Sequence, residues 1–252
     1  MTRLDVFLVQ SGWSESRAQA QALIAAGKVR VDGQVVRKAA YRLSEGAQVS
    51  VEEGRRFVSR GGEKLEAALK AFSVMVGGRI CADVGASTGG FTDCLLQHGA
   101  QRVYAIDVGR ELLHPLLRAD ERVVVMEGVN ARYLAALPER VSLVTLDVSF
   151  ISLRLLLPVV RGWMEEAGEV IALIKPQFEA GREAVARGQG VIRDARVHRR
   201  VLIEVLEFAQ GQGYALQGVI RSPVASENAE FLAYLRTGGA GVEVEACLQQ
   251  LA

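Results

Sequence analysis

The chain has 252 residues, of which 30 are basic, 29 are acidic and half are hydrophobic. This composition predicts a folded protein of one or two domains and excludes extensive intrinsic disorder. The formal net charge of +1 excludes a uniformly basic nucleic-acid binder. No apolar stretch reaches the roughly eighteen residues that span a bilayer, and the N-terminus lacks a secretory signal, so we expect a cytoplasmic protein. Three scattered cysteines predict neither a disulfide framework nor a zinc site: Cys81, Cys94 and Cys247.

Residues 1–52 predict a small α+β domain. Hydrophobic residues at helical spacing predict a first helix that ends at Gly12, and a second helix begins at Ser14 or Ser16. Gly27 follows that helix as a terminating glycine. Alternating valines predict short strands on either side of a turn at residues 32–33. The residues that carry these patterns are Leu4, Phe7 and Leu8, then Ala18, Ala22, Leu23 and Ala26, then Val29, Val31, Val35, Val36, Val49 and Val51.

Charge is divided unevenly along the chain. Residues 1–60 contain ten basic and six acidic side chains, whereas the remainder contains 20 basic and 23 acidic ones. A basic front domain and a basic linker at residues 53–62 fit binding to a phosphate backbone. A solvated surface that happens to be basic would give the same count, so charge alone leaves both interpretations open.

The pattern of residues in the front domain is more specific than its charge. Arg3-Leu4-Asp5, Ser16-Arg17, Gly27-Lys28-Val29 and Val31-Asp32-Gly33 resemble the S4-like RNA-binding domain, which recurs in a ribosomal protein and in RNA-modifying enzymes. In that family the second helix and the following turn present basic residues to structured RNA. The candidate RNA-binding residues are Arg3, Arg17, Lys28, Arg30, Lys38 and Arg60.

From residue 63 onward the chain alternates strand and helix patterns. This order predicts a mostly parallel, doubly wound α/β sheet of the Rossmann-like type, with ligands bound where the strands end at the switch point. Predicted strands occupy residues 80–84, 102–107, 123–126, 141–147, 169–174, 216–221 and 230–236. Predicted helices include residues 89–99, 151–166 and 197–210.

A glycine-rich loop follows the first strand of this sheet. Glycines at 85, 89 and 90 do not match the G-x-G-x-x-G spacing that seats a dinucleotide pyrophosphate. Asp83 before the loop favours a ligand with an ammonium group, and Asp107 at the end of the next strand can accept ribose hydroxyls. S-adenosylmethionine fits this pattern best, while a dinucleotide and a purely structural turn remain open. The candidate cofactor-binding residues are Asp83, Gly85, Ala86, Ser87, Thr88, Gly89, Gly90, Phe91, Asp107 and Asn130.

Four polar residues stand at the ends of predicted elements. Lys64 begins a helix, Asp147 and Lys175 end strands, and Glu230 begins the last strand. Any one of them could be a surface charge, but parallel strands bring Asp147 and Lys175 to one edge. Together with residues 83–91 they resemble the Lys-Asp-Lys-Glu tetrad of FtsJ-type ribose 2′-O-methyltransferases. The whole chain resembles the TlyA family of hemolysin-A-like ribosomal RNA methyltransferases.

The resemblance implies methyl transfer to a ribose 2′-hydroxyl, with cytidine in large-subunit and also small-subunit RNA as the expected target. Lys175 is then the expected base, Asp147 orients it, and Glu230 holds Lys64 or Lys175 in place. No metal is implied. The segment after Asp107 lacks the Tyr and Gln of the family, and the loop before Asn228 lacks its glycines.

Two other functions compete with this one. A non-catalytic RNA-binding protein on a degenerate methyltransferase fold would not need the intact tetrad. A membrane-active protein, as the hemolysin name suggests, would need an amphipathic or spanning segment that the sequence does not supply. His98, His114 and His198 are expected to be surface residues, and a helix face around Arg196, Arg199 and Arg200 is either solvated or a second RNA contact.

Overall fold

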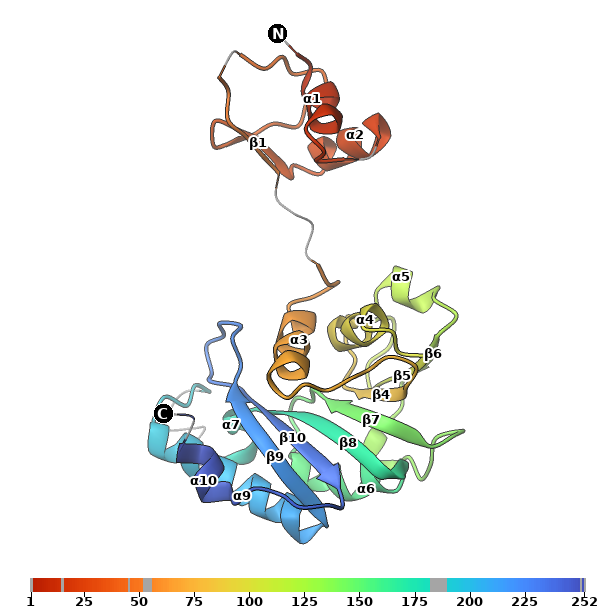
Figure 1. The fold of residues 1–252 in the computed structure, drawn as a ribbon, viewed down its shortest axis with the longest axis vertical. Helices are drawn as coiled ribbons and strands as arrows, with labels where there is room; N and C mark the ends of the chain where they lie inside the picture. Colours follow the sequence, from red (N-terminus) through yellow and green to blue (C-terminus); the bar gives the residue numbers. More distant parts are fainter. Residues whose placement is uncertain are drawn as a thin grey trace. The chain divides into compact units, whose positions relative to one another are not determined.

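A computed structural model describes residues 2–14, 16–44, 46–51, 56–181, 190–249 and 251. The chain forms two compact units, residues 1–56 and 57–252 (Figure 1). Of the linker predicted at 53–62, residues 53–55 lie outside the described part. Phe57 is buried in the larger unit, and a helix begins at Gly61.

The front unit packs two helices on a three-stranded antiparallel sheet of order β2-β1-β3. Its elements are α1 (Leu4–Gln10), α2 (Arg17–Ala25), β1 (Val29–Val31), β2 (Gln34–Val35) and β3 (Val49–Val51). The turn between β1 and β2 is the predicted one, with Asp32 and Gly33 both at positive φ. The core of this unit consists of Leu4, Leu8, Ala20, Ile24, Val29, Val31 and Leu43.

The second helix exists as predicted, and Leu23 packs against the core, but the three alanines predicted to be apolar positions do not lie in it. Ser16 is its N-cap and accepts a hydrogen bond from the Gln19 backbone N–H. Ala20 and Ile24 are the buried positions, one helical turn apart. The predicted alanines lie on the exposed side because small alanines fit either face and carry little directional signal: Ala18, Ala22 and Ala26.

The larger unit is built on a seven-stranded sheet of order β6-β5-β4-β7-β8-β10-β9. The five strands from β6 to β8 are parallel, and β10 runs antiparallel to both β8 and β9. The mostly parallel sheet predicted from the strand–helix alternation is therefore confirmed. Its strands are β4 (Ile80–Val84), β5 (Arg102–Asp107), β6 (Val123–Glu127), β7 (Val141–Leu146), β8 (Met164–Ile174), β9 (Tyr214–Arg221) and β10 (Phe231–Thr237).

Helices cover both faces of this sheet (Figure 1). On one face α3 and α4 pack on residues such as Cys81, Val103 and Leu143, and on the other α6, α9 and α10 pack on their sequence neighbours such as Ala82 and Val144. Successive strand residues point to opposite faces, so every central strand is buried on both sides. The helices are α3 (Gly61–Ala71), α4 (Gly90–Gln97), α5 (Pro115–Arg118), α6 (Leu157–Arg161), α7 (Pro176–Glu179), α9 (Ala195–Gly211) and α10 (Val244–Gln249).

The helix predicted over residues 151–166 is wrong. The structure has a single 3₁₀ turn, η2 (Leu153–Leu155), then the short α6, and β8 already starts at Met164. Pro158 lies in the first turn of α6, where its missing N–H is harmless, and Gly162 ends that helix. The long apolar run belongs to several consecutive elements, which hydrophobic periodicity alone merges into one.

Candidate active site

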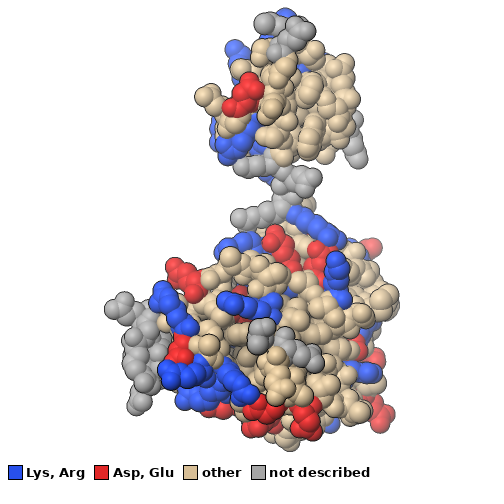
Figure 2. All heavy atoms as spheres, turned by 60° about the vertical axis from the view of Figure 1, so that its left-hand side comes forward, with Lys and Arg blue, Asp and Glu red and all other residues tan. Residues whose placement is uncertain are grey.

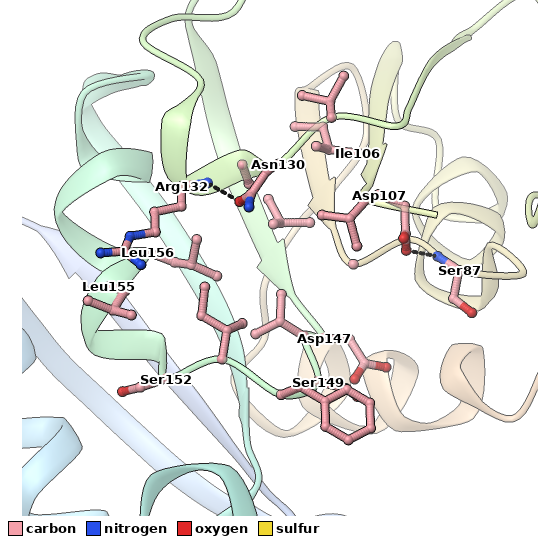
Figure 3. Close-up of a pocket in the computed structure, with 18 of the residues that line it drawn as sticks. Ser87, Ile106, Asp107, Asn130, Arg132, Asp147, Ser149, Ser152, Leu155 and Leu156 are labelled. Atoms are coloured by element: carbon pink, nitrogen blue, oxygen red, sulfur yellow. Dashed lines mark hydrogen bonds between the residues drawn. The ribbon is translucent and has the colours of Figure 1, made fainter. Parts of the chain in front are cut away.

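A cavity of about 650 Å³ opens at the carboxyl ends of β4, β5 and β7. Strand β4 lies between β5 and β7, so the chain first builds the sheet outward on one side of β4 and later on its other side. Ligands of doubly wound sheets usually bind at this point. Figure 3 shows Asp107, Asn130 and Asp147 approaching it from three different segments. Its lining includes Val84, Gly85, Ser87, Ile106, Asp107, Val108, Leu112, Val129, Asn130, Ala131, Arg132, Asp147, Val148, Ser149, Phe150, Ile151, Ser152, Leu155 and Leu156.

Gly85 makes the closest approach between the glycine loop and the loop after β7. Its φ is 84°, and a Cβ at this position would overlap the carbonyl oxygen of Asp147. The Gly85 N–H donates to Ile106 O at 2.8 Å, which ties the loop to β5. Only glycine satisfies both the left-handed backbone and the close contact, so this glycine sets how near the cavity's two walls come.

Asp107 ends β5 with its carboxylate held by two backbone N–H groups. Ser87 N donates to Oδ2 at 2.8 Å (Figure 3). Gly109 N donates to Oδ1 at 2.7 Å. A carboxylate has about four acceptor sites, so each oxygen can still accept a ligand hydroxyl. Asn130 lies opposite and accepts the Arg132 backbone N–H through its side chain.

Asp83 is buried behind the loop and is absent from the cavity lining described above, and its contact with a cofactor ammonium stays a prediction. Its side chain is 0% exposed, and it accepts hydrogen bonds from Thr92 Oγ1 at 2.7 Å and Thr145 Oγ1 at 3.0 Å. Burial raises its pKa to about 7. Of the other loop candidates, the cavity lining described above lacks Ala86, Thr88, Gly89, Gly90 and Phe91.

The four predicted catalytic residues form two ion pairs. Lys175 Nζ lies 2.6 Å from Asp147 Oδ1 and donates to Ser149 Oγ at 3.1 Å. Lys64, in the first turn of α3, places its Nζ 2.6 Å from Glu230 Oε2 just before β10. The side chains are 9–21% exposed, so each pair is largely removed from water. Asp147 lines the cavity, and the contact with Lys175 brings an amine to its edge.

Phe150 is an apolar side chain left in the open beside this site. It is 91% exposed, has a φ of 65°, and lies among the cavity-lining residues. Its ring contacts that of Phe178 with centroids 5.0 Å apart. A non-glycine residue at positive φ is uncommon, and an exposed aromatic ring at a cavity mouth is available to a ligand.

Two acidic residues that organise the site were not predicted from the sequence. Glu127, at the end of β6, accepts hydrogen bonds from the backbone N–H groups of residues 111–113 and forms an ion pair with Arg118. The pKa of Glu127 is lowered to about 2, mainly by the Arg118 guanidinium and further by these N–H groups. Glu179, in α7, is buried and contacts the segment after β7. Neither has a sequence signal, because backbone N–H groups supply part of their bonding and their side-chain partners are distant in the sequence.

The basic residues of the front unit are partly organised by one buried carboxylate. Asp5 is 0% exposed and accepts hydrogen bonds from Arg3, from Arg17 at 2.9 Å and from Gln21 at 3.0 Å. The two guanidinium groups hold its pKa well below the usual range. Lys28 directly precedes β1 of the same unit, and Arg30 lies on that strand. Lys38 is exposed, and Arg60 is the residue just before α3 of the larger unit.

The arginine-rich face of α9 is paired with acidic groups. Arg196 pairs with Asp194, Arg199 with Glu245, and Arg200 lies near Glu204. Figure 2 shows acidic and basic side chains mixed on this side of the larger unit. These contacts fit a solvated helix face better than a second RNA contact.

No cluster of three metal-ligating side chains occurs within the described residues. The three cysteines are buried free thiols. None of the helices that the structure describes is long and apolar enough to cross a membrane.

Comparisons with known proteins agree with this geometry. The model of the FtsJ-like methyltransferase family matches residues 57–237, and that of the S4 domain matches residues 2–49. The chain is 45% identical over 241 residues to the 16S/23S rRNA (cytidine-2′-O)-methyltransferase TlyA of Mycobacterium tuberculosis, covering 93% of this chain and 90% of the relative. It is 40% identical to Hemolysin A of Brachyspira hyodysenteriae, covering 92% of this chain and 98% of that protein.

Solved structures show the same fold. A structure named as a hemolysin from Streptococcus thermophilus has a TM-score of 0.74 and 39% identity, covering 99% of this chain and 94% of that one. An S-adenosylmethionine-dependent methyltransferase from Listeria monocytogenes has a TM-score of 0.55 at 18% identity, covering 72% of this chain and 100% of that one. The second likeness concerns the fold of the larger unit.

Proposed function

The chain belongs to the FtsJ-like methyltransferase family, and on that premise we propose that it methylates ribosomal RNA at a ribose 2′-hydroxyl, using S-adenosylmethionine. The relative from Mycobacterium tuberculosis is named for cytidine 2′-O-methylation of 16S and 23S rRNA, which makes cytidine the expected target. An S4 domain at residues 2–49 supports an RNA substrate. Such a substrate would place the protein in the cytoplasm.

The residues around the cavity fit S-adenosylmethionine. Asp107 has acceptor sites left for two ribose hydroxyls, and Asn130 presents a polar side chain next to the apolar Val108 and Leu112. A volume of about 650 Å³ suits a ligand of this size. Asp83, buried behind the loop, would act by bonding Thr92 of α4 and Thr145 of β7, which ties both elements to β4 beneath the cavity.

When bound, S-adenosylmethionine supplies a methyl group already activated by a positive sulfur. What the chain must add is alignment of the hydroxyl and removal of its proton. Lys175 is the residue that we propose accepts that proton on Nζ. Asp147, 2.6 Å away, fixes the direction of Nζ, and this contact at the cavity edge is the observation that carries the proposal.

Glu230 and Lys64 complete the site from the other side. The sequence left either lysine open as the partner of Glu230, and the 2.6 Å contact with Lys64 supports that pairing. We propose that Lys64 presents a positive charge and hydrogen-bond donors to the substrate. Phe150, exposed beside Asp147, offers a flat face on which an unstacked base can rest.

Replacement of Lys175 tests the proposal. Lys175→Ala should reduce methyl transfer to ribosomal subunits by about 10³-fold, because general-base catalysis contributes 10²–10⁴-fold. Labelled S-adenosylmethionine measures transfer, and equilibrium dialysis should show unchanged cofactor binding. Lys70→Ala, at an exposed position of α3, is the matched control and should retain wild-type activity. Near-normal turnover by Lys175→Ala would refute the assignment of the base.

Mapping the product tests the substrate. Mass spectrometry of nuclease-digested ribosomal RNA should locate the added methyl on the ribose of a cytidine. A methyl on a base would contradict the proposed reaction, and a methyl on another nucleotide's ribose would contradict the cytidine assignment alone.

A further inference from the structure

Two neighbouring loops carry the proposed base and its carboxylate partner. Strands β7 and β8 are parallel neighbours, with Leu146 opposite Ala172, so their carboxyl ends leave the sheet side by side. The segment after β7 begins with Asp147 and continues to η2. The segment after β8 begins with Lys175 and continues directly into the single turn of α7. Any sliding of one segment past the other would separate Lys175 from Asp147.

Three successive contacts join these segments. The first is the Lys175 amine with Asp147 and Ser149. The second is the ring contact between Phe150 and Phe178. The third is Glu179, whose carboxylate accepts a hydrogen bond from Ser152 Oγ at 2.5 Å and from Leu153 N at 2.7 Å. The contacts run in parallel order along both segments, and Asp147, Phe150 and Ser152 on the first segment all line the cavity.

The third contact differs from the other two in its burial. The Glu179 side chain is 2% exposed, while Phe150 is 91% exposed and the Lys175–Asp147 pair borders the cavity. Charge-assisted hydrogen bonds to a buried carboxylate are among the stronger ones, and a buried acceptor without donors is costly. Arg154 lies 3.8 Å from Glu179, so the charge is also partly balanced.

We propose that Glu179 is a positioning residue for the reaction: its buried carboxylate fastens the segment after β7 to α7 and thereby keeps Lys175 against Asp147. The inference rests on the proposed function, because it assumes that the Lys175–Asp147 pair does the chemistry. Glu179 itself is absent from the described cavity lining, and its contacts with Ser152 and Leu153 connect it to that lining.

The decisive variant is Glu179→Gln. Its single carbonyl oxygen can accept from Leu153 N, but its amide then points at Ser152 Oγ, which already accepts the backbone N–H of Arg154. At saturating RNA and cofactor, the single-turnover rate should fall about tenfold or more, while the affinity for RNA changes less than twofold. Glu204→Gln is the matched control, because Glu204 also approaches Arg154, at 3.9 Å, whereas the Ser152 hydroxyl and the Leu153 N–H donate to Glu179.

A milder variant covers the case in which Glu179→Gln folds poorly. Ser152→Ala removes the hydroxyl that donates to Glu179 and accepts the Arg154 N–H, but it leaves the bond from Leu153 N, so it should lower the rate by a smaller factor. The double variant should be no slower than Glu179→Gln alone, because both changes break one interaction. A buried carboxylate with a purely structural role would lower the melting temperature but leave the rate of the folded enzyme unchanged. That result, or additive effects in the double variant, would overturn the proposal.

Hydrogen exchange of the full chain gives a readout that does not depend on activity. Glu179→Gln should accelerate amide exchange in residues 148–156, and Glu204→Gln should not. If the wild-type protein methylated no RNA, but Glu179→Gln still accelerated amide exchange in residues 148–156, the proposed function would be wrong. The role of Glu179 in fastening the two segments would remain supported. Unchanged exchange in residues 148–156 would overturn the fastening role whatever the activity.

Discussion

Each unit contains a completely buried aspartate, and the pKa values of these two aspartates are shifted in opposite directions. Asp5 in the front unit is bonded to two arginines, which hold its pKa well below the usual range. Asp83 in the larger unit is bonded to two threonine hydroxyls, and burial raises its pKa to about 7. Both side chains are 0% exposed. Burial therefore raises the pKa of Asp83, which its hydroxyl partners oppose only in part, whereas the guanidinium partners of Asp5 lower the pKa of that carboxyl.

The difference matches the work we propose for each unit. In the front unit the charged carboxylate gathers Arg3 and Arg17, whose side chains remain 42% and 56% exposed. Such arginines keep donors for a phosphate backbone while losing little freedom on binding. In the larger unit Asp83 can support the glycine loop without placing a full negative charge behind the cavity. If this division holds, changes in one unit should alter RNA binding and changes in the other should alter the chemistry.

The largest effect after that of Lys175→Ala is expected from Glu230→Gln. Removing the carboxylate leaves Lys64, whose side chain is 13% exposed, without its charged partner. The single-turnover rate at saturating RNA should fall about 100-fold, with RNA affinity in a filter-binding assay unchanged. An equal loss of RNA affinity would mean that this ion pair contacts RNA, and the division between the units would break.

A change in the front unit should show the reverse pattern. Arg17→Ala should weaken RNA binding several-fold and reduce the slope of log affinity against log salt by about one, because one phosphate contact is lost. The rate at saturating RNA should stay at the wild-type level. Arg196→Ala, where the arginine is paired with Asp194 on α9, is the control. A reduced salt slope in that control would identify the α9 face as a second RNA contact.

The smallest expected effects concern stability. Asp5 and Asp83 should make the free energy of unfolding change with pH in opposite directions. Asp5 has a lowered pKa, so its contribution is present above pH 4 and shrinks as the pH falls below it. Asp5→Asn should cost about 2 kcal/mol near pH 7, from lost bonds to charged groups, and less at pH 3. Asp83 has a raised pKa, so its contribution declines as the pH rises from 4 to 7.

Asp83→Asn should therefore gain stability relative to wild type over that same pH range. Urea unfolding of both variants and the wild type at several pH values measures the two slopes. Slopes of the same sign would contradict the contrast drawn between the two buried carboxyls.

Much of the fold could be predicted from the sequence because its elements have strong periodicity. The strands at residues 80–84 and 102–107 have the same bounds in the sequence pattern and in the structure. Prediction failed where the signal was ambiguous. The apolar run at 151–166 contains η2, α6 and the start of β8, and the alanines of α2 marked no face.

The candidate site could be predicted only in part. Lys64, Asp147, Lys175 and Glu230 stand out because each is a charged residue at the end of an element. The partner of Glu230 could not be predicted, because its contact with Lys64 depends on β10 running antiparallel beside β8. Glu127 and Glu179 were invisible, since backbone N–H groups supply much of their bonding and leave no trace in residue identity.

The sequence by itself determined a basic front domain, a parallel sheet with a glycine loop, and a set of charged residues at strand ends. Those properties follow from local patterns, which periodicity and residue type express directly. Tertiary structure alone decided that Asp83 faces two threonines, that Glu230 meets Lys64, and that Glu179 joins two loops. Each of these depends on residues distant in the chain, because a side chain's partner and charge state are set by the neighbours that folding brings to it.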